Sequence, residues 1–246
     1  MNLSNQDLQL GQGMFVSSAT QQHPLGTRGS TPDGRVYRYC RAGASDLVAG
    51  NVIQAPAVQT AFLANTPPVV AAGAVSFSYT PGSATAVANS YAEGYLQVDT
   101  TPGNGYVNTI KNHPAIASAT AFTLTLFDED PIQIALTASS RVGIMQNKYA
   151  DVIQAPVTTA TGTVVGVAAY IIKATQYGWL QTWGPCSVLI NGTPALGVYV
   201  VSPSATTAGS VDASTAANLV LARIVGCMMQ IGVSGKNNFV DLLISP

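Results

Sequence analysis

The sequence predicts an all-β protein with a β-sandwich or small β-barrel architecture, and three observations support that fold class. Short runs rich in β-branched and aromatic residues recur along the 246 residues of the chain. Gly, Pro and Asn separate nearly all of these runs, as expected for strands joined by tight turns. The only helical patterns are short, at residues 83–92 and 214–218.

The first predicted strand follows a Thr-Pro-Asp-Gly turn at residues 31–34. Residues 35–42 then alternate in type, which places Tyr37 and Tyr39 on one face and Arg38 on the other. The further predicted strands, in order, are residues 51–53, 75–79, 95–98, 106–110, 122–127, 132–136, 151–153, 163–172, 179–183, 187–190, 197–201, 219–225 and 240–244.

A weak internal repeat predicts a duplicated β unit. Asn-Val-Ile-Gln-Ala-Pro at residues 51–56 returns as Asp-Val-Ile-Gln-Ala-Pro at residues 151–156. Each copy is followed by a Gly-aromatic-Leu-Gln strand, at residues 94–97 and 178–181, and then by an Asn-Gly turn. We therefore expect a first β domain over residues 31–148 and a second over residues 149–246, with one intertwined β domain as the alternative.

Residues 1–30 show no sustained strand or helix period, and their apolar residues fall in two small patches. Such a segment cannot bury enough surface by itself to offset its ordering entropy. We therefore expect an extended N-terminal arm that is disordered in isolation or ordered against another chain. The region 1–12 also lacks a secretory leader, so we expect synthesis in a cytoplasm.

Charge is scarce, because only 9% of residues are Asp, Glu, Lys or Arg and the formal net charge is −1. No overall field draws such a chain to nucleic acid, and no apolar run approaches the ~18 to 20 residues of a membrane helix, so we expect neither partner. The scarcity instead suggests a surface that is covered in an assembly. Four of the ten cations fall in one N-terminal segment, as a local positive patch or as ordinary strand charges: Arg28, Arg35, Arg38 and Arg41.

Catalytic chemistry is not apparent, so we expect no enzyme and no cofactor, with a hydrolase as a remote alternative. His23 and His113 both precede a proline, which favours an extended loop position over a catalytic one. Cys40, Cys186 and Cys227 form no Cys-x-x-Cys pair, which favours buried reduced thiols. The carboxylate cluster at residues 128–130 predicts a charged hairpin tip, with a calcium site as the alternative.

An aromatic cluster surrounds one predicted strand. Tyr177, Trp179 and Trp183 share a face of it by the period of two. Burial in a core or a subunit contact is the favoured interpretation. An exposed platform of Trp179 and Trp183 that stacks on sugar rings is the alternative.

Several segments resemble small β-rich virion proteins of tailed bacteriophages. The resemblance begins in residues 25–54, which include Asp-Gly-Arg-Val-Tyr-Arg-Tyr at 33–39 and Ala-Gly-Asn-Val-Ile-Gln at 49–54. It continues in Tyr-Gly-Trp-Leu-Gln at 177–181, Gly-Ser-Val at 209–211, and Ile-Val-Gly at 224–226 with a closing strand at 240–244. It implies a decoration or cement subunit on the outer surface of a head, commonly a homotrimer.

The expected function is therefore structural: a capsid decoration protein that bridges capsomers, with the major capsid protein and copies of itself as partners. A head-fibre or tail-associated adhesin that recognises host glycan is the alternative. The candidate partner-binding residues are Arg28, Arg35, Arg38, Arg41, Leu8, Leu10, Met14 and Phe15.

Overall fold

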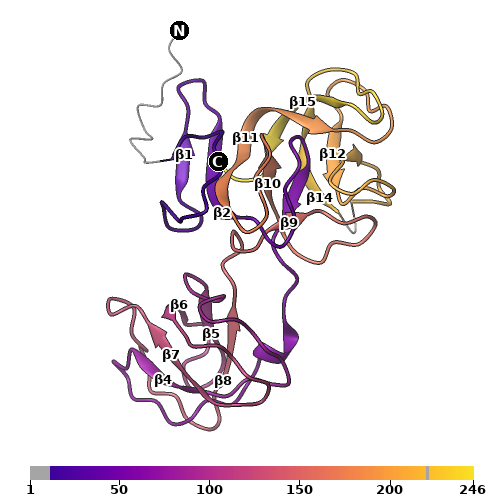
Figure 1. The fold of residues 1–246 in the computed structure, drawn as a ribbon. Coiled ribbons are helices and arrows are strands. Elements are labelled where there is room, and N and C mark those ends of the chain that lie inside the picture. The colour runs from indigo at the N-terminus through magenta and orange to yellow at the C-terminus, as the bar shows by residue number, and fades with distance from the viewer. Residues whose placement is uncertain (1–11, 220–221) are drawn as a thin grey trace. The chain divides into compact units, whose positions relative to one another are not determined.

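A computed structural model describes residues 12–219 and 222–246 of the chain. The described residues are all-β, as predicted: they form two curled antiparallel sheets and one short 3-10 helix, η1 (Thr60–Phe62) (Figure 1). The helices predicted at residues 83–92 and 214–218 are turns instead. In the first, Ala86 pairs with Ile116 in an isolated bridge and Asn89 has a φ of 60°, which interrupts a helix.

The larger sheet has ten strands and the smaller has five. The ten are β1 (Arg28–Ser30), β2 (Val36–Arg41), β3 (Val52–Gln54), β9 (Ile153–Gln154), β10 (Val164–Ala168), β11 (Tyr177–Leu189), β12 (Tyr199–Ser202), β13 (Asp212–Ala213), β14 (Arg223–Met228) and β15 (Asn237–Leu243). The five are β4 (Ser76–Tyr79), β5 (Tyr95–Thr100), β6 (Val107–Asn112), β7 (Phe122–Leu126) and β8 (Arg141–Met145).

The chain divides into two compact units, each with one of the sheets. Unit 1 comprises Met1–Ala57 and Lys148–Pro246, and unit 2 is the segment between them, Val58–Asn147. This division differs from the two consecutive domains that the repeat predicts, because residues 31–57 belong with the second half of the chain. The reason is strand pairing: β2 pairs with β11 and β3 pairs with β10, both far away in sequence.

The two copies of the repeat lie next to each other in unit 1. β3 and β9 pair antiparallel, with Ile53 opposite Gln154 and Gln54 opposite Ile153. Equivalent residues of the two copies are therefore related by a local two-fold axis within one sheet. The repeat marks a strand pair of unit 1 rather than equivalent strands of two domains.

Residues 12–27 of the expected N-terminal arm lie on unit 1 itself, whereas residues 1–11 of that arm lie outside the described residues. Ser18 and Tyr177 exchange two backbone hydrogen bonds, of 2.9 and 2.8 Å. The Tyr39 hydroxyl donates to Gln12 Oε1 at 2.7 Å. Met14 is buried in a cluster with Tyr37, Tyr39 and Trp179, and this cluster supplies the apolar contacts that the segment lacks by itself.

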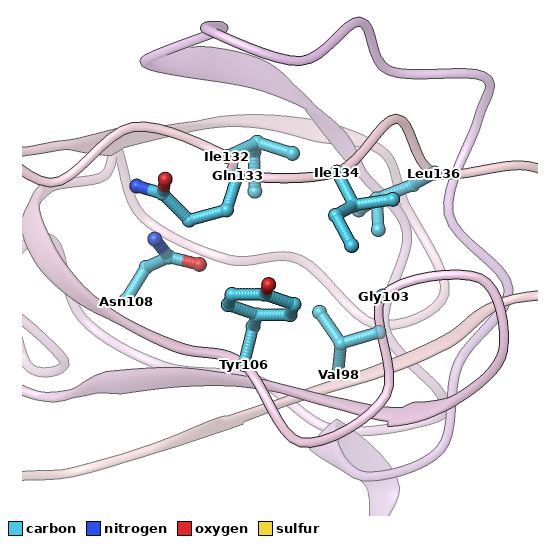
Figure 2. A pocket seen from close by; sticks show the side chains of 8 residues that line it. All are labelled: Val98, Gly103, Tyr106, Asn108, Ile132, Gln133, Ile134 and Leu136. Carbon is cyan, nitrogen blue, oxygen red and sulfur yellow. The ribbon is translucent and has the colours of Figure 1, made fainter.

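Unit 2 has a separate hydrophobic core between its strands and η1, which includes Phe62, Tyr79, Leu96 and Leu124. Figure 2 shows a hollow in this unit, lined by Val98, Gly103, Tyr106, Asn108, Ile132, Gln133, Ile134 and Leu136. The hollow has no room for a water molecule, so it is part of the packing and not a ligand site. Within residues 12–219 and 222–246, no helix is long and apolar enough to cross a membrane.

Candidate functional site

Four of the ten Lys and Arg residues form ion pairs with described carboxylates. Two pairs belong to the predicted arginine cluster: Arg35 Nε lies 2.8 Å from Asp33 Oδ2, and Arg41 contacts both oxygens of Asp151 at 2.9 and 2.8 Å. The other two pairs, Lys111 with Asp128 and Lys173 with Asp46, each span 2.9 Å. Arg35 and Arg41 are thus compensated within the chain.

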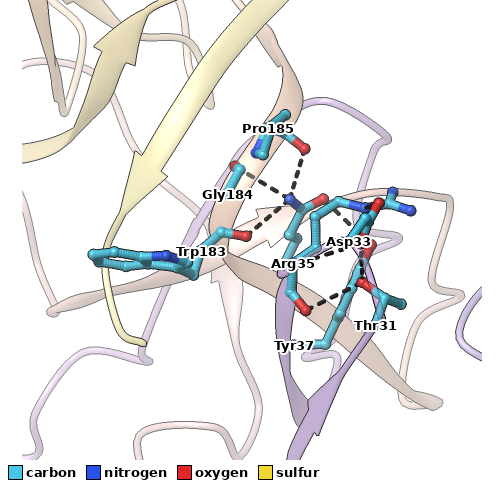
Figure 3. Close-up of polar contacts among 8 residues, drawn as sticks. Thr31, Asp33, Arg35, Tyr37, Trp183, Gly184 and Pro185 are labelled. Carbon is cyan, nitrogen blue, oxygen red and sulfur yellow. Dashed lines mark hydrogen bonds and ion pairs between the residues drawn. The ribbon is translucent and has the colours of Figure 1, made fainter. Parts of the chain in front are cut away.

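Figure 3 shows how the turn before β2 holds Arg35. The Thr31 hydroxyl donates to Asp33 and also contacts the Arg35 carbonyl, so the turn orients the carboxylate that receives the guanidinium. The Thr31 hydrogen bond is the main cause that lowers the pKa of Asp33. Asp33 and Arg35 therefore stabilise a local turn, and the pair leaves little net charge for a partner.

Arg28 and Arg38, in contrast, face each other without an Asp or Glu partner among the described residues. They are directly opposite on β1 and β2, so their side chains leave the same face of the sheet. Arg28 is exposed. Arg38 donates to the main-chain oxygens of Gly26 at 3.3 Å and of Pro246, the last residue of the sequence, at 3.1 Å, while its buried Nε has no hydrogen-bond partner among the described residues.

Two cations from distant parts of the chain join them. Lys148 and Arg223 are both exposed, and Lys148 Nζ lies 5.1 Å from the centre of the Tyr149 ring. Desolvation and then the positive charges of Arg38 and Arg223 lower the pKa of Lys148, so both arginines lie within electrostatic reach of Lys148. Arg223 donates to the Ile244 carbonyl at 3.2 Å.

These four residues, Arg28, Arg38, Lys148 and Arg223, are called the basic patch below. No carboxylate side chain in the described parts of the chain forms an ion pair with any of them. Like charges that face each other without compensation are unfavourable in the free chain and favour an acidic partner. Sequence reasoning found Arg28 and Arg38 but missed Lys148 and Arg223, because each stands alone in its sequence neighbourhood.

The predicted apolar contacts have different environments. Leu8 and Leu10 lie outside the described residues. Met14 is buried, whereas Phe15 is 57% exposed. Phe15 and Phe239, which is 55% exposed, line a groove of about 290 Å³ together with Arg35 and Asn237.

The tryptophans do not form a shared exposed platform. Trp179 is fully buried, as the favoured interpretation predicts, and packs edge-on against Tyr39 with ring centres 5.0 Å apart. Trp183 is half-buried, and it is the residue at which the pairing of β11 with β2 ends and its pairing with β15 begins. Trp179 therefore cannot stack on a sugar, which removes half of the alternative glycan surface.

The remaining titratable groups that the sequence singles out include the carboxylates of residues 128–130 and the cysteines. No group of three or more His, Cys, Asp and Glu in the described chain is placed to hold a metal ion. At the tip, residues 128–130, Asp128 pairs with Lys111, and Asp130 accepts hydrogen bonds from Asn108 and Thr109. Burial raises the pKa of Cys186 to about 12, which leaves its thiol protonated at neutral pH.

Comparison with protein-family models, with curated proteins and with solved structures finds no match to this chain.

Proposed function

We propose that this chain is a structural subunit that attaches to an acidic protein surface through its basic patch, as a decoration protein on the outer surface of a bacteriophage head. The observation that carries the proposal is the uncompensated charge of Arg28, Arg38, Lys148 and Arg223. In a chain with so few charged residues, four cations in one place are a large share of the total. The phage setting comes from the sequence resemblance.

The mechanism is adhesive. Arg28, Lys148 and Arg223 are exposed, so they can approach carboxylates on a partner without rearrangement of unit 1. Each contact contributes little in water, but many identical subunits on one lattice multiply the effect. The major capsid protein is the proposed partner, and further copies of the chain are the proposed neighbours.

The location of the chain in purified phage particles tests whether it decorates the head. Quantitative mass spectrometry and cryo-electron microscopy of purified particles should find hundreds of copies on the head. A handful of copies at one vertex or on the tail would contradict decoration and favour a fibre component.

Charge reversal in the basic patch tests whether this patch is the attachment surface. The double variant Arg28→Glu and Lys148→Glu should reduce head occupancy at least tenfold, because two attractions become repulsions. Lys236→Glu is the matched control, since Lys236 is an exposed cation of unit 1 outside the patch. Equal occupancy for the double variant and the parent chain would overturn the role of the patch.

A further inference from the structure

A cleft of about 340 Å³ opens beside the basic patch in unit 1. Its lining includes Arg223 and Ser202, with Ala160, Gly162 and Thr163 from the segment before β10. Of the described residues that line it, none is acidic. Arg223 thus belongs both to the patch and to the cleft.

Ser202 gives the cleft a second polar group. The residue is 1% exposed, and its hydroxyl has no hydrogen-bond partner among the described residues. A buried hydroxyl without a partner is unfavourable, so it needs an explanation. Ser202 is directly opposite Arg223 on β12 and β14, which places the hydroxyl and the guanidinium on one face.

A hydroxyl donor beside a guanidinium is suited to an oxyanion. Arg223 uses Nη2 to donate to the Ile244 carbonyl, and a guanidinium has further N–H groups in a planar fork that matches a carboxylate. The Ser202 O–H can donate to the same group. A carboxylate in this cleft would satisfy Ser202 and offset the charge that the patch leaves uncompensated.

The chain itself supplies an acidic group of this kind. Unit 1 has eight Lys and Arg against six Asp and Glu, whereas unit 2 has two against five. The surplus of unit 2 is concentrated at the tip, residues 128–130, where Asp130 N–H donates to the Phe127 carbonyl at 3.0 Å and closes a turn. Asp128 and Asp130 have partners, but Glu129 is exposed and makes no hydrogen bond or ion pair with a described residue.

We propose that the cleft at Ser202 and Arg223 is a carboxylate-binding site and that its occupant is Glu129 from the tip of a second copy of the chain. This inference rests on the proposed function, of which it specifies the self-association. The contact is heterologous, because the tip of one copy meets the cleft of the next. Such contacts close into rings or continue as filaments.

Sedimentation velocity of the full chain at low and high salt tests this arrangement. The parent chain should associate at about 50 mM salt and dissociate as salt screens the contact. Arg223→Glu and Glu129→Arg should each weaken association at least tenfold, and the double variant should restore it because the charges are exchanged. Lys236→Glu and Asp99→Arg make the same charge changes at exposed positions in units 1 and 2 and should have little effect.

Ser202→Ala separates the cleft from general electrostatic attraction. We expect association to weaken by about threefold to tenfold, the loss of one hydrogen bond, with an unchanged or higher melting temperature because the hydroxyl has no partner within the described chain. Unchanged association in Ser202→Ala would overturn the cleft as the binding site. Failure of the double variant to recover would overturn Glu129 as the occupant.

A parent chain that stays monomeric at all salt concentrations would overturn the inference while leaving head attachment intact. Head occupancy that depends on Arg28 and Lys148, together with monomeric behaviour in solution, would show that outcome. If the chain does not associate and its head occupancy also does not depend on Arg28 and Lys148, the proposed function is contradicted as well.

Discussion

Unit 1 and unit 2 use their few charged residues in different ways. In unit 2, Lys111 pairs with Asp128 and Arg141 donates to the carbonyls of Ala138 and Ser140, so both of its cations are satisfied within the described chain. In unit 1, four of eight cations gather in the basic patch, and none of them pairs with a described Asp or Glu side chain. A net charge of −1 for the whole chain thus conceals a basic unit and an acidic one. Average composition is therefore a poor guide to the partners of this protein.

The largest effects are expected from mutations in the two hydrophobic cores, which test whether the units unfold independently. Trp179→Ala should destabilise unit 1 by about 3–5 kcal/mol, because it removes a fully buried ring from the cluster with Tyr37 and Tyr39. Leu124→Ala should destabilise unit 2 by about 2–5 kcal/mol for the same reason. Both tryptophans lie in unit 1, so tryptophan fluorescence during urea unfolding reports that unit alone.

The fluorescence transition should shift in Trp179→Ala, where Trp183 remains as the probe, and should stay in place in Leu124→Ala. Calorimetry of Leu124→Ala should show the shifted transition of unit 2. A fluorescence shift in both variants would mean that the two units unfold as one.

Acid should destabilise unit 2 through His113. Its Nε2 accepts a hydrogen bond from the Tyr91 N–H at 3.0 Å, and its Nδ1 donates to the Pro114 carbonyl at 2.7 Å, so the folded state needs the neutral ring. Burial lowers the pKa of His113 below 6.5. The unfolded chain therefore binds a proton first as pH falls through 6.5, and stability that is present above this pH is progressively lost below it.

Calorimetry of the unit 2 transition between pH 7.5 and 5.5 measures this loss. His113→Gln keeps an acceptor for the Tyr91 N–H and should reduce the pH dependence, whereas His23→Gln in unit 1 should leave it unchanged. The same pH dependence in His113→Gln and the parent would exclude His113 as its source.

Ion pairs give a smaller contrast between the units. Asp151→Asn should destabilise unit 1 by about 1 kcal/mol, because Arg41 binds both carboxylate oxygens in a partly buried position. Asn also tolerates the φ of 47° at this residue, so backbone strain does not contribute. Lys111→Ala breaks an exposed pair of unit 2 and should change stability by less than about 0.5 kcal/mol. Equal losses in urea unfolding would contradict this ranking.

The smallest effect is expected within the basic patch. Arg28→Gln should leave stability within about 0.5 kcal/mol of the parent or raise it, because the change removes a repulsion with Arg38. Arg223→Gln should raise the pKa of Lys148, which NMR titration of its side chain measures. An unchanged pKa would show that the two cations do not sense each other.

The fold class was predictable from the sequence because strand patterns and turn residues are local signals. The long-range pairing was not predictable, since β2 pairs with β11 and β3 pairs with β10, each more than a hundred residues further along the chain. β11 illustrates the limit: it joins two predicted strands through Gly184 and Pro185, and its register with β2 shifts between Gln181 and Trp183. There the Gln181 side chain donates to the carbonyls of Trp183, Gly184 and Pro185 at 3.1, 3.3 and 2.8 Å.

The candidate site was half predictable for the same reason. Arg28 and Arg38 form a visible cluster in the sequence, but so do Arg35 and Arg41. Asp33, the partner of Arg35, is a sequence neighbour, whereas only the fold brings Asp151 to Arg41. Lys148 and Arg223 carry no local signal, because their proximity to Arg38 arises from strand pairing across the whole unit. The hydroxyl of Ser202 is likewise ordinary in sequence and notable only through its burial opposite Arg223.

Because the two copies of the repeat pair with each other, the segment of chain between them is free to vary. β3 and β9 are in effect a β-hairpin whose connecting turn is residues 55–152, an entire folded unit. The entropy of closing such a connection grows slowly, by about 0.6 kcal/mol for each doubling of its length. Residues 58–147 are therefore a cassette: a short turn or an unrelated domain could replace them while β3 and β9 keep their pairing.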